Sequence, residues 1–248
     1  MTKVALVTGA SRGIGRATAL LLARQGYAVG VNYLKDDVAA QQVVAEIESL
    51  GGRAWALRAD IGDESQVVAM FRQLDATLGP IDALVNNAGI LFQQSSIEQL
   101  TAERINKVLT TNVTGYFLCC REAVMRMAHR HSGQGGAIVN VSSAAARLGA
   151  PGEYIDYAAS KGAVDTLTTG LALEVAAQGI RVNAVRPGLI YTEMHASGGE
   201  PGRVDRVKSS LPMQRGGTPE EVAEIIAWLL SDAASYVTGS FIEASGGR

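Results

Sequence analysis

Short apolar runs alternate with longer amphipathic segments along most of this chain. The first apolar run, Val4–Thr8, ends at a glycine cluster. A helical pattern then begins at Ile14, Gly26 stops it, and a second apolar run covers Ala28–Tyr33. Strands that alternate with helices and are apolar on both faces form parallel sheets covered on both sides. The pattern therefore predicts an α/β fold.

The same alternation continues to the C-terminus and predicts about seven strands in one doubly wound, Rossmann-type domain over residues 1–248. The further expected strands are Arg53–Asp60, Asp82–Gly89, Ala137–Ser143, Arg181–Gly188 and a last run near Phe241. The further expected helices are Asp36–Gly52, Glu64–Gly79, Thr101 to about His131, Ile155–Gln178 and Pro219–Asp232. One segment, Met194–Glu221, is rich in Gly, Pro, Ser and charge and breaks the pattern. A long loop in a compact domain is usually functional, so we expect a substrate loop at about 192–216.

Composition and charge narrow the class of protein. The chain has 248 residues, 47% hydrophobic and 19% charged, enough for one sizeable core. A net charge of -2 with scattered basic residues gives no electrostatic reason to expect nucleic acid or a membrane surface as a partner. No apolar run of signal-peptide or membrane-spanning length is present. These features predict a cytoplasmic protein.

The cysteines and histidines do not have the spacing that is typical of disulfide frameworks or metal sites. Cys119 and Cys120 are adjacent inside an apolar helical run, which predicts buried free thiols. The three histidines, His129, His131 and His195, lack the cysteine or carboxylate spacing of a zinc site. We therefore expect no metal.

The segment "TGASRGIG" places Gly9, Gly13 and Gly15 between the first strand and the first helix. Glycines there allow the backbone to approach a pyrophosphate, whose charge is met by N–H groups at the helix N-terminus. The spacing differs from G-x-G-x-x-G, and no Walker lysine follows. The strand–turn–helix context predicts a dinucleotide site that includes Gly9 and the stretch Ser11, Arg12, Gly13, Ile14 and Gly15.

The choice between NAD and NADP is made near the end of the second strand, where an acidic residue would bind the ribose hydroxyls and repel a phosphate. This chain has Asn32, Tyr33 and Lys35 there, and Arg12 in the glycine loop. Two basic side chains without a strand-end acid favour NADP. The nearby "DD" at positions 36 and 37 keeps NAD possible.

The segment "YIDYAASK" contains two tyrosines and one lysine. Lys161 follows Tyr157 by four residues, so both side chains project from one face of a helix. An ammonium near a phenol stabilises the phenolate, so we expect a lowered pKa at Tyr157. Tyr154 lies near the expected helix start and is the poorer partner. Ser142 and Ser143 end a strand at the edge where ligands of open α/β sheets bind, and either can hold a substrate oxygen.

These motifs, in this order, resemble the short-chain dehydrogenase/reductase superfamily, and the resemblance covers Val4–Gly247. The matching motifs are "TGASRGIG", "NNAG", "LTTNVTG", "IVNVSS", "YAASK" and "RPGLIYTEM". Among its members the chain is most similar to bacterial NADP-linked enzymes of the 3-oxoacyl-carrier-protein reductase and glucose dehydrogenase type. The resemblance implies an oxidoreductase that transfers a hydride between a nicotinamide cofactor and a carbonyl or secondary alcohol.

The resemblance also implies a catalytic tetrad of Asn112, Ser143, Tyr157 and Lys161. Tyr157 would be the general acid or base, Lys161 would lower its pKa and bind the nicotinamide ribose, Ser143 would hold the carbonyl, and Asn112 would support a water. The implied cofactor contacts are Asp60 and Ile61 at the adenine, Asn87, Ala88 and Gly89 at the adenosine, and Pro187, Gly188, Ile190 and Thr192 at the carboxamide. The spacing from Ser143 to Tyr157 is one residue longer than in the commonest members of the superfamily. Ser142 therefore remains an alternative candidate for the serine of the tetrad.

The resemblance also bears on assembly, and the residues expected near the substrate leave its class open. The resemblance implies a homotetramer in which the helices Thr101–His131 and Ile155–Gln178 pair across an interface. The expected substrate wall, Ala144–Leu148, Tyr154, Leu189, Tyr191 and residues 194–215, mixes apolar and polar groups. It suits sugars, acyl thioesters, steroids and small ketones equally. The alternative hypothesis is a binding protein that senses the dinucleotide without useful turnover.

Overall fold

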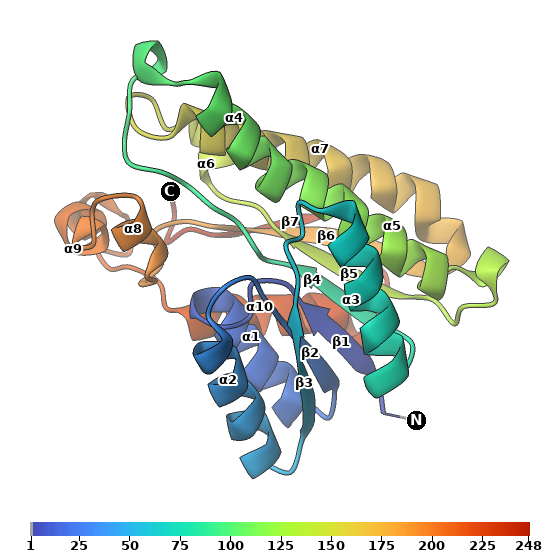
Figure 1. Cartoon of the computed structure of the whole chain (residues 1–248). Coiled ribbons are helices and arrows are strands. Elements are labelled where there is room, and N and C mark those ends of the chain that lie inside the picture. The colour runs from blue at the N-terminus through green and yellow to red at the C-terminus, as the bar shows by residue number, and fades with distance from the viewer. Residues whose placement is uncertain (1) are drawn as a thin grey trace.

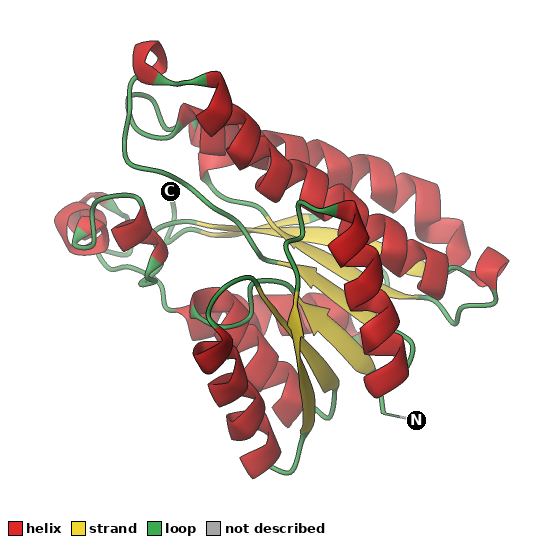
Figure 2. Ribbon diagram, viewed as in Figure 1, coloured by secondary structure: helices red, strands yellow, loops and turns green. Residues whose placement is uncertain are grey.

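The computed structural model of the protein describes residues 2–248 and contains one sheet of seven parallel strands between two layers of helices (Figures 1 and 2). The strand order is β3-β2-β1-β4-β5-β6-β7. The strands are β1 Val4–Val7, β2 Ala28–Tyr33, β3 Arg53–Arg58, β4 Ala83–Asn86, β5 Gly136–Val141, β6 Ile180–Pro187 and β7 Phe241–Ala244. The chain thus forms the single doubly wound domain that the alternation predicts.

The longer helices are α1 Gly13–Arg24, α2 Asp37–Ser49, α3 Glu64–Thr77, α4 Ala102–Leu109, α5 Gly115–Met127, α7 Ile155–Val175 and α10 Pro219–Leu230. Caps explain several of their ends. Asp36, Asp63 and Thr101 accept hydrogen bonds from the first turns of α2, α3 and α4. At α10, Thr218 and Glu221 form a capping box, with Pro219 in the first turn.

Alternate residues of each buried strand supply two separate apolar cores. One face of the sheet packs against α1, α2 and α10, through residues such as Val7, Val31 and Val139. The other face packs against α3, α5 and α7, through residues such as Leu6, Leu84 and Ile138. Cys119 and Cys120 lie buried as free thiols in this second core, as the sequence predicts.

Two segments differ from the expected elements. The expected helix from Thr101 is divided by a single π-helical turn, Thr110–Thr114, between α4 and α5. The expected long loop contains two short helices, α8 Met194–Ser197 and α9 Arg203–Val207, which lie at the C-terminal edge of the sheet (Figure 1). Among residues 2–248, no helix combines the length and the apolar character needed to cross a bilayer.

The order of the strands indicates the edge of the sheet at which a ligand would bind. The chain runs outward from β1 to β2 and β3, and then returns to continue through β4 on the other side of β1. In open α/β sheets a ligand crevice forms outside the carboxyl ends of the strands where the order reverses. The glycine loop after β1 and the "NNAG" segment after β4 meet at this point.

Candidate functional site

At Gly9 and Gly15 the loop after β1 is packed so closely, in part against the segment after β4, that a side chain has no room. A Cβ on Gly9 would lie 2.9 Å from Ala88 Cα, and one on Gly15 would lie 2.3 Å from the Gly9 carbonyl oxygen. Gly9 and Gly13 also have positive φ angles of 62° and 53°. Asn87 closes the contact, because its Nδ2 donates to the carbonyl oxygens of Thr8 at 2.9 Å and Gly9 at 3.1 Å.

The N-terminus of α1 is open to an anion. Arg12 occupies the N-cap position without a side-chain hydrogen bond to the helix, and the first turn contains no acidic residue. The free N–H groups and the helix dipole therefore favour negative charge at this point. The cradle that the glycines leave, next to this helix end, fits a pyrophosphate group.

Asn32 and Tyr33, both expected at the cofactor, use their side chains inside the fold. Asn32 accepts a hydrogen bond from Gly9 N–H at 3.2 Å and donates to the carbonyl oxygens of Leu57 and Ala59. Tyr33 donates to Asp37. Asn32 thus supports the glycine loop, whereas the side chains of Arg12 and Lys35 are exposed.

The remaining expected cofactor residues lie along the same edge. Asp60 accepts from Gly62 N–H at 2.9 Å, and Ile61 is buried against Gly115. A Cβ on Gly89 would lie 3.5 Å from Asn112 Oδ1 and 3.7 Å from Lys161 Nζ. Thr192 approaches Gly13 from the segment after β6. The segment Pro187–Ile190 leaves β6 and bridges to Gly217.

The structure brings Tyr157, Lys161 and Ser143 together where β5 ends and α7 begins. Lys161 Nζ lies over the face of the Tyr157 ring, 5.6 Å from its centroid. Lys161 is buried and donates to the Val141 carbonyl oxygen at 2.7 Å and to Tyr116 Oη at 3.3 Å. Tyr116, which the sequence reasoning missed, follows Asn112 by four residues, and that helical spacing was the available signal.

The two serines at the end of β5 have different environments. The buried Ser142 hydroxyl donates to Asp165 Oδ1 at 2.6 Å. The Ser143 hydroxyl is partly exposed and accepts from Ala145 N–H at 3.1 Å. Ser143 also interacts with the Tyr157 phenol. The rival serine is therefore engaged in the fold, and Ser143 faces the candidate site.

The side chain of Tyr154, the alternative to Tyr157, also makes contacts within the fold. Tyr154 is buried, its hydroxyl donates to the Gly198 carbonyl oxygen at 3.2 Å, and its ring packs under the Arg203 guanidinium. Arg203 in turn forms an ion pair with Glu153 at 2.5 Å. These contacts join the segment of α8 and α9 to the start of α7, next to Tyr157.

Asn112 occupies the π-helical turn and is fully buried. Its Oδ1 accepts from Ile90 N–H at 2.8 Å, and its Nδ2 donates to the Ile90 carbonyl oxygen at 2.9 Å. Nδ2 also donates to Ser160 Oγ at 3.1 Å, one residue before Lys161. Asn112 therefore fixes the segment after β4 against the middle of the candidate site.

Burial controls the protonation of Tyr157 and Lys161. It raises the pKa of Tyr157 to about 12, against the Ser143 hydrogen bond, and it lowers the pKa of Lys161 to about 7. The sequence led us to expect a lowered pKa at Tyr157. In this structure the pKa is raised instead, because desolvation outweighs the stabilisation of the phenolate, and Lys161 directs its hydrogen bonds to Val141 and Tyr116.

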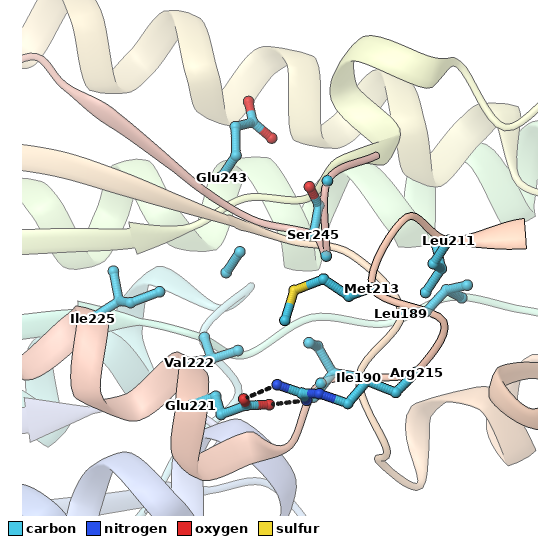
Figure 3. Close-up of a pocket in the computed structure, with 14 residues that line it drawn as sticks. Leu189, Ile190, Leu211, Met213, Arg215, Glu221, Val222, Ile225, Glu243 and Ser245 are labelled. Atoms are coloured by element: carbon cyan, nitrogen blue, oxygen red, sulfur yellow. Dashed lines mark hydrogen bonds and ion pairs between the residues drawn. The ribbon is translucent and has the colours of Figure 1, made fainter. Parts of the chain in front are cut away.

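A cavity of about 290 Å³ lies beside the segment that follows β6 (Figure 3). Apolar side chains of that segment, of the chain after α9 and of α10 line it, among them Leu189, Leu211, Met213, Val222 and Ile225. The ion pair between Arg215 and Glu221, 2.6 Å long, lies at its side. Of the expected substrate wall, only Leu189, Leu211, Met213 and Arg215 line this cavity.

The chain is similar to known proteins over nearly its whole length. Residues 9–248 match the family model described as enoyl-(acyl carrier protein) reductase. The chain is 73% identical over 245 residues to the uncharacterized oxidoreductase YgfF of Escherichia coli K12, covering 99% of each chain. It is 40% identical over 247 residues to the 3-oxoacyl-[acyl-carrier-protein] reductase FabG of Staphylococcus aureus Mu50, covering 100% of this chain and 98% of that one.

Two solved structures share the fold over nearly the whole chain. A short-chain type dehydrogenase/reductase from Mycobacterium marinum has a TM-score of 0.92 at 38% identity, covering 99% of this chain and 94% of that one. A short chain dehydrogenase from Burkholderia cenocepacia J2315 in complex with NADP has a TM-score of 0.89 at 37% identity, covering 99% and 97%.

Proposed function

Because the chain belongs to the short-chain dehydrogenase/reductase family of oxidoreductases, we propose that it uses NADPH to reduce a carbonyl group, with Tyr157 as the proton donor. The observation that carries this proposal is the juxtaposition of Tyr157, Ser143 and Lys161 at the carboxyl edge of the sheet. A nicotinamide cofactor bound along this edge would supply the hydride.

Each side chain of the tetrad has a separate task in the proposed reaction. Ser143 donates its hydroxyl hydrogen to the substrate carbonyl oxygen and orients it. Tyr157 donates the proton that this oxygen receives as it becomes an alcohol. Lys161 binds the nicotinamide ribose and supplies positive charge close to the phenol. Asn112 holds Ile90 and Ser160 in place and supports a water through which Lys161 exchanges protons with solvent.

The protonation state of Tyr157 suits its proposed role as the proton donor in reduction. With a pKa of about 12 the phenol is protonated at neutral pH, which is the form that a proton donor needs. The reverse oxidation of an alcohol requires the phenolate, which the same burial disfavours. In both directions the proton moves between the phenol oxygen and the substrate oxygen.

For the cofactor, we propose NADP over NAD. The α1 N-terminus and the cradle of Gly9, Gly13 and Gly15 suit the pyrophosphate. Arg12 and Lys35, both exposed beside this cradle, would meet the 2′-phosphate, and Asp37 already accepts a hydrogen bond from Tyr33. The NADP complex of the related Burkholderia cenocepacia protein supports the same choice.

We also propose a homotetramer that acts in the cytoplasm. Large apolar side chains are exposed on the outer faces of two neighbouring helices, namely Phe117 and Met125 on α5 and Leu173 on α7. Large exposed apolar side chains on neighbouring helices favour an interface. The segment 192–216, with its short helices, is the proposed substrate loop.

The test of this function is NADPH oxidation against a chemically diverse carbonyl panel, run in parallel with NADP reduction by sugars and alcohols. Turnover of any carbonyl that depends on NADPH supports the proposal. Cofactor binding in a calorimeter without turnover of any compound would favour a dinucleotide-sensing protein instead.

A further inference from the structure

The Asp165 carboxylate on α7 contacts the ends of β5 and β6. It lies on α7, one helical turn after Lys161, and its side chain is 15% exposed. Oδ1 accepts from the Ser142 hydroxyl at 2.6 Å, and Oδ2 accepts from Arg186 Nε at 3.0 Å, with the second Arg186 nitrogen at 2.9 Å. Each of these hydrogen bonds involves a charged group, and such bonds are stronger and more directional than neutral ones.

The partners of Asp165 adjoin residues that the proposed reaction uses. Ser142 directly precedes Ser143 at the end of β5. Arg186 directly precedes the Pro187–Gly188 segment at the end of β6. The helix α7 carries Asp165 together with Tyr157 and Lys161. One side chain therefore sets the distances between the strand ends and the helix.

Further charges on β6, β7 and α6 form a chain of ion pairs that ends at this carboxylate. Arg186 also pairs with Glu243 on β7 at 2.9 Å and packs 4.2 Å from the centroid of the Phe241 ring. Glu243 pairs with Arg147 on α6 at 3.0 Å. A mostly buried ion pair is weak evidence for stability, because desolvation opposes the attraction, but it can fix one geometry among several.

We propose that Asp165 is a positioning residue, which through Ser142 and Arg186 holds Ser143, Lys161 and the Pro187–Gly188 segment in the arrangement that hydride transfer requires. This inference rests on the proposed function. Misplacing a reacting group by about 1 Å can reduce a rate about a hundredfold, so the role has a measurable consequence.

The charge of Asp165 has a second effect that a purely structural residue would lack. The carboxylate raises the pKa of Lys161 against the larger effect of burial, which lowers that pKa to about 7. Removing the negative charge therefore lowers the Lys161 pKa further. Reduction, which uses the charged ammonium, should then decline at a lower pH than in the parent protein.

The test compares Asp165→Asn with Asp75→Asn. Asp75 pairs with Arg126 at 2.8 Å between α3 and α5, away from the candidate site. For Asp165→Asn we expect kcat to fall roughly tenfold to hundredfold while KM for the carbonyl changes by less than about threefold. The pH at which reduction is half lost should fall by at least about half a unit. Asp75→Asn should match the parent in all three quantities.

Two additional variants keep the test decisive if Asp165→Asn does not fold. Ser142→Ala and Arg186→Lys each remove or weaken one contact, and each should lower kcat. Ser142→Ala combined with Asp165→Ala should cost no more than Asp165→Ala alone, because Asp165→Ala already removes the hydrogen bond from the Ser142 hydroxyl. Unchanged kcat and pH profiles in these variants, or an equal loss in Asp75→Asn, would overturn the inference.

The outcomes also separate this inference from the proposed function. A parent protein that reduces no carbonyl contradicts the function itself. A parent protein that is active, with Asp165 variants equally active, contradicts only the positioning role. NADPH affinity, measured by fluorescence without turnover, gives an independent readout. It should weaken in Asp165→Asn, where Lys161 and Pro187–Gly188 are displaced, and remain unchanged in Asp75→Asn.

Discussion

Lys161 Nζ and Tyr116 Oη lie 3.3 Å apart, with both side chains fully enclosed by the protein. The same ammonium lies 5.0 Å from the centroid of the Tyr116 ring and donates to the Val141 carbonyl oxygen. Desolvation dominates these contacts and lowers the pKa of Lys161 to about 7. The fold therefore retains a costly buried amine at the place where the proposed chemistry needs a cation.

Replacing this amine should stabilise the protein while inactivating it. Lys161→Met removes a buried charge, and we expect a gain of about 1–4 kcal/mol in the free energy of unfolding at pH 6, together with loss of turnover. The unfolded chain binds a proton near pH 10.5, whereas the folded chain does so only near pH 7. The stability of the parent should thus rise between these pH values.

Denaturant titrations of both proteins across this pH range check the prediction. Lys161→Met should lack the rise, so that its advantage disappears as the pH approaches 10.5. Equal pH slopes for the two proteins would show that the amine carries no such penalty.

Asn112 should prove important for both stability and rate. Asn112→Ala removes three hydrogen bonds to Ile90 and Ser160, and we expect the free energy of unfolding to fall by about 2–3 kcal/mol. The rate of reduction should fall as well, because Ser160 adjoins Lys161. Chemical denaturation and steady-state kinetics measure the two effects. The exposed Asn106→Ala on α4 serves as the control, and a loss of equal size there would refute the prediction.

Arg12 should select the phosphorylated cofactor. Arg12→Ser removes the proposed charge-assisted hydrogen bond to the 2′-phosphate, which is worth about 1.5–3 kcal/mol. Because NADH lacks this phosphate, KM for NADPH should rise at least about tenfold while KM for NADH stays constant. Initial rates with both cofactors give the answer. Arg24→Ser, at the far end of α1, should leave both values unchanged. A parallel loss with NADH would assign Arg12 to the pyrophosphate or to folding.

The exposed apolar faces of α5 and α7 should hold the subunits together. Leu173 is 80% exposed in the single chain, and Leu173→Glu would place a charge in the proposed interface at a large cost in desolvation. We expect light scattering to report a tetramer for the parent and smaller species for this variant. Val38 on α2 is 68% exposed in the single chain, and the control variant Val38→Glu should remain tetrameric. A monomeric parent would exclude the proposed assembly.

The sequence predicted the architecture well because its strongest signals are physical requirements of the fold. Buried parallel strands must be apolar on both faces, so β1, β2 and β5 stand out as short apolar runs. Glycines at positions 9 and 15 are required by the close contact with the segment after β4. The helical spacing of Tyr157 and Lys161 placed both side chains on one face of α7.

Other features depend on contacts between distant segments and leave no local signal. The π-helical turn at Thr110–Thr114 is fixed by the contact of Asn112 with Ile90. The short helices α8 and α9 lie in a segment whose composition resembles a loop, and the ion pair between Arg203 and Glu153 joins them to the segment just before α7. The raised pKa of Tyr157 follows from how deeply the fold encloses it, which helical spacing alone does not reveal.

The most direct measurement is the rate of NADPH-dependent carbonyl reduction by Tyr157→Phe beside Tyr154→Phe. Both changes remove one hydroxyl near the start of α7, but the Tyr154 hydroxyl is bonded to Gly198 and lies outside the proposed chemistry. Loss of the proton donor should reduce kcat at least about a hundredfold in Tyr157→Phe, with Tyr154→Phe keeping most of its activity. If Tyr157→Phe reduced the carbonyl as fast as the parent, the central claim would be contradicted.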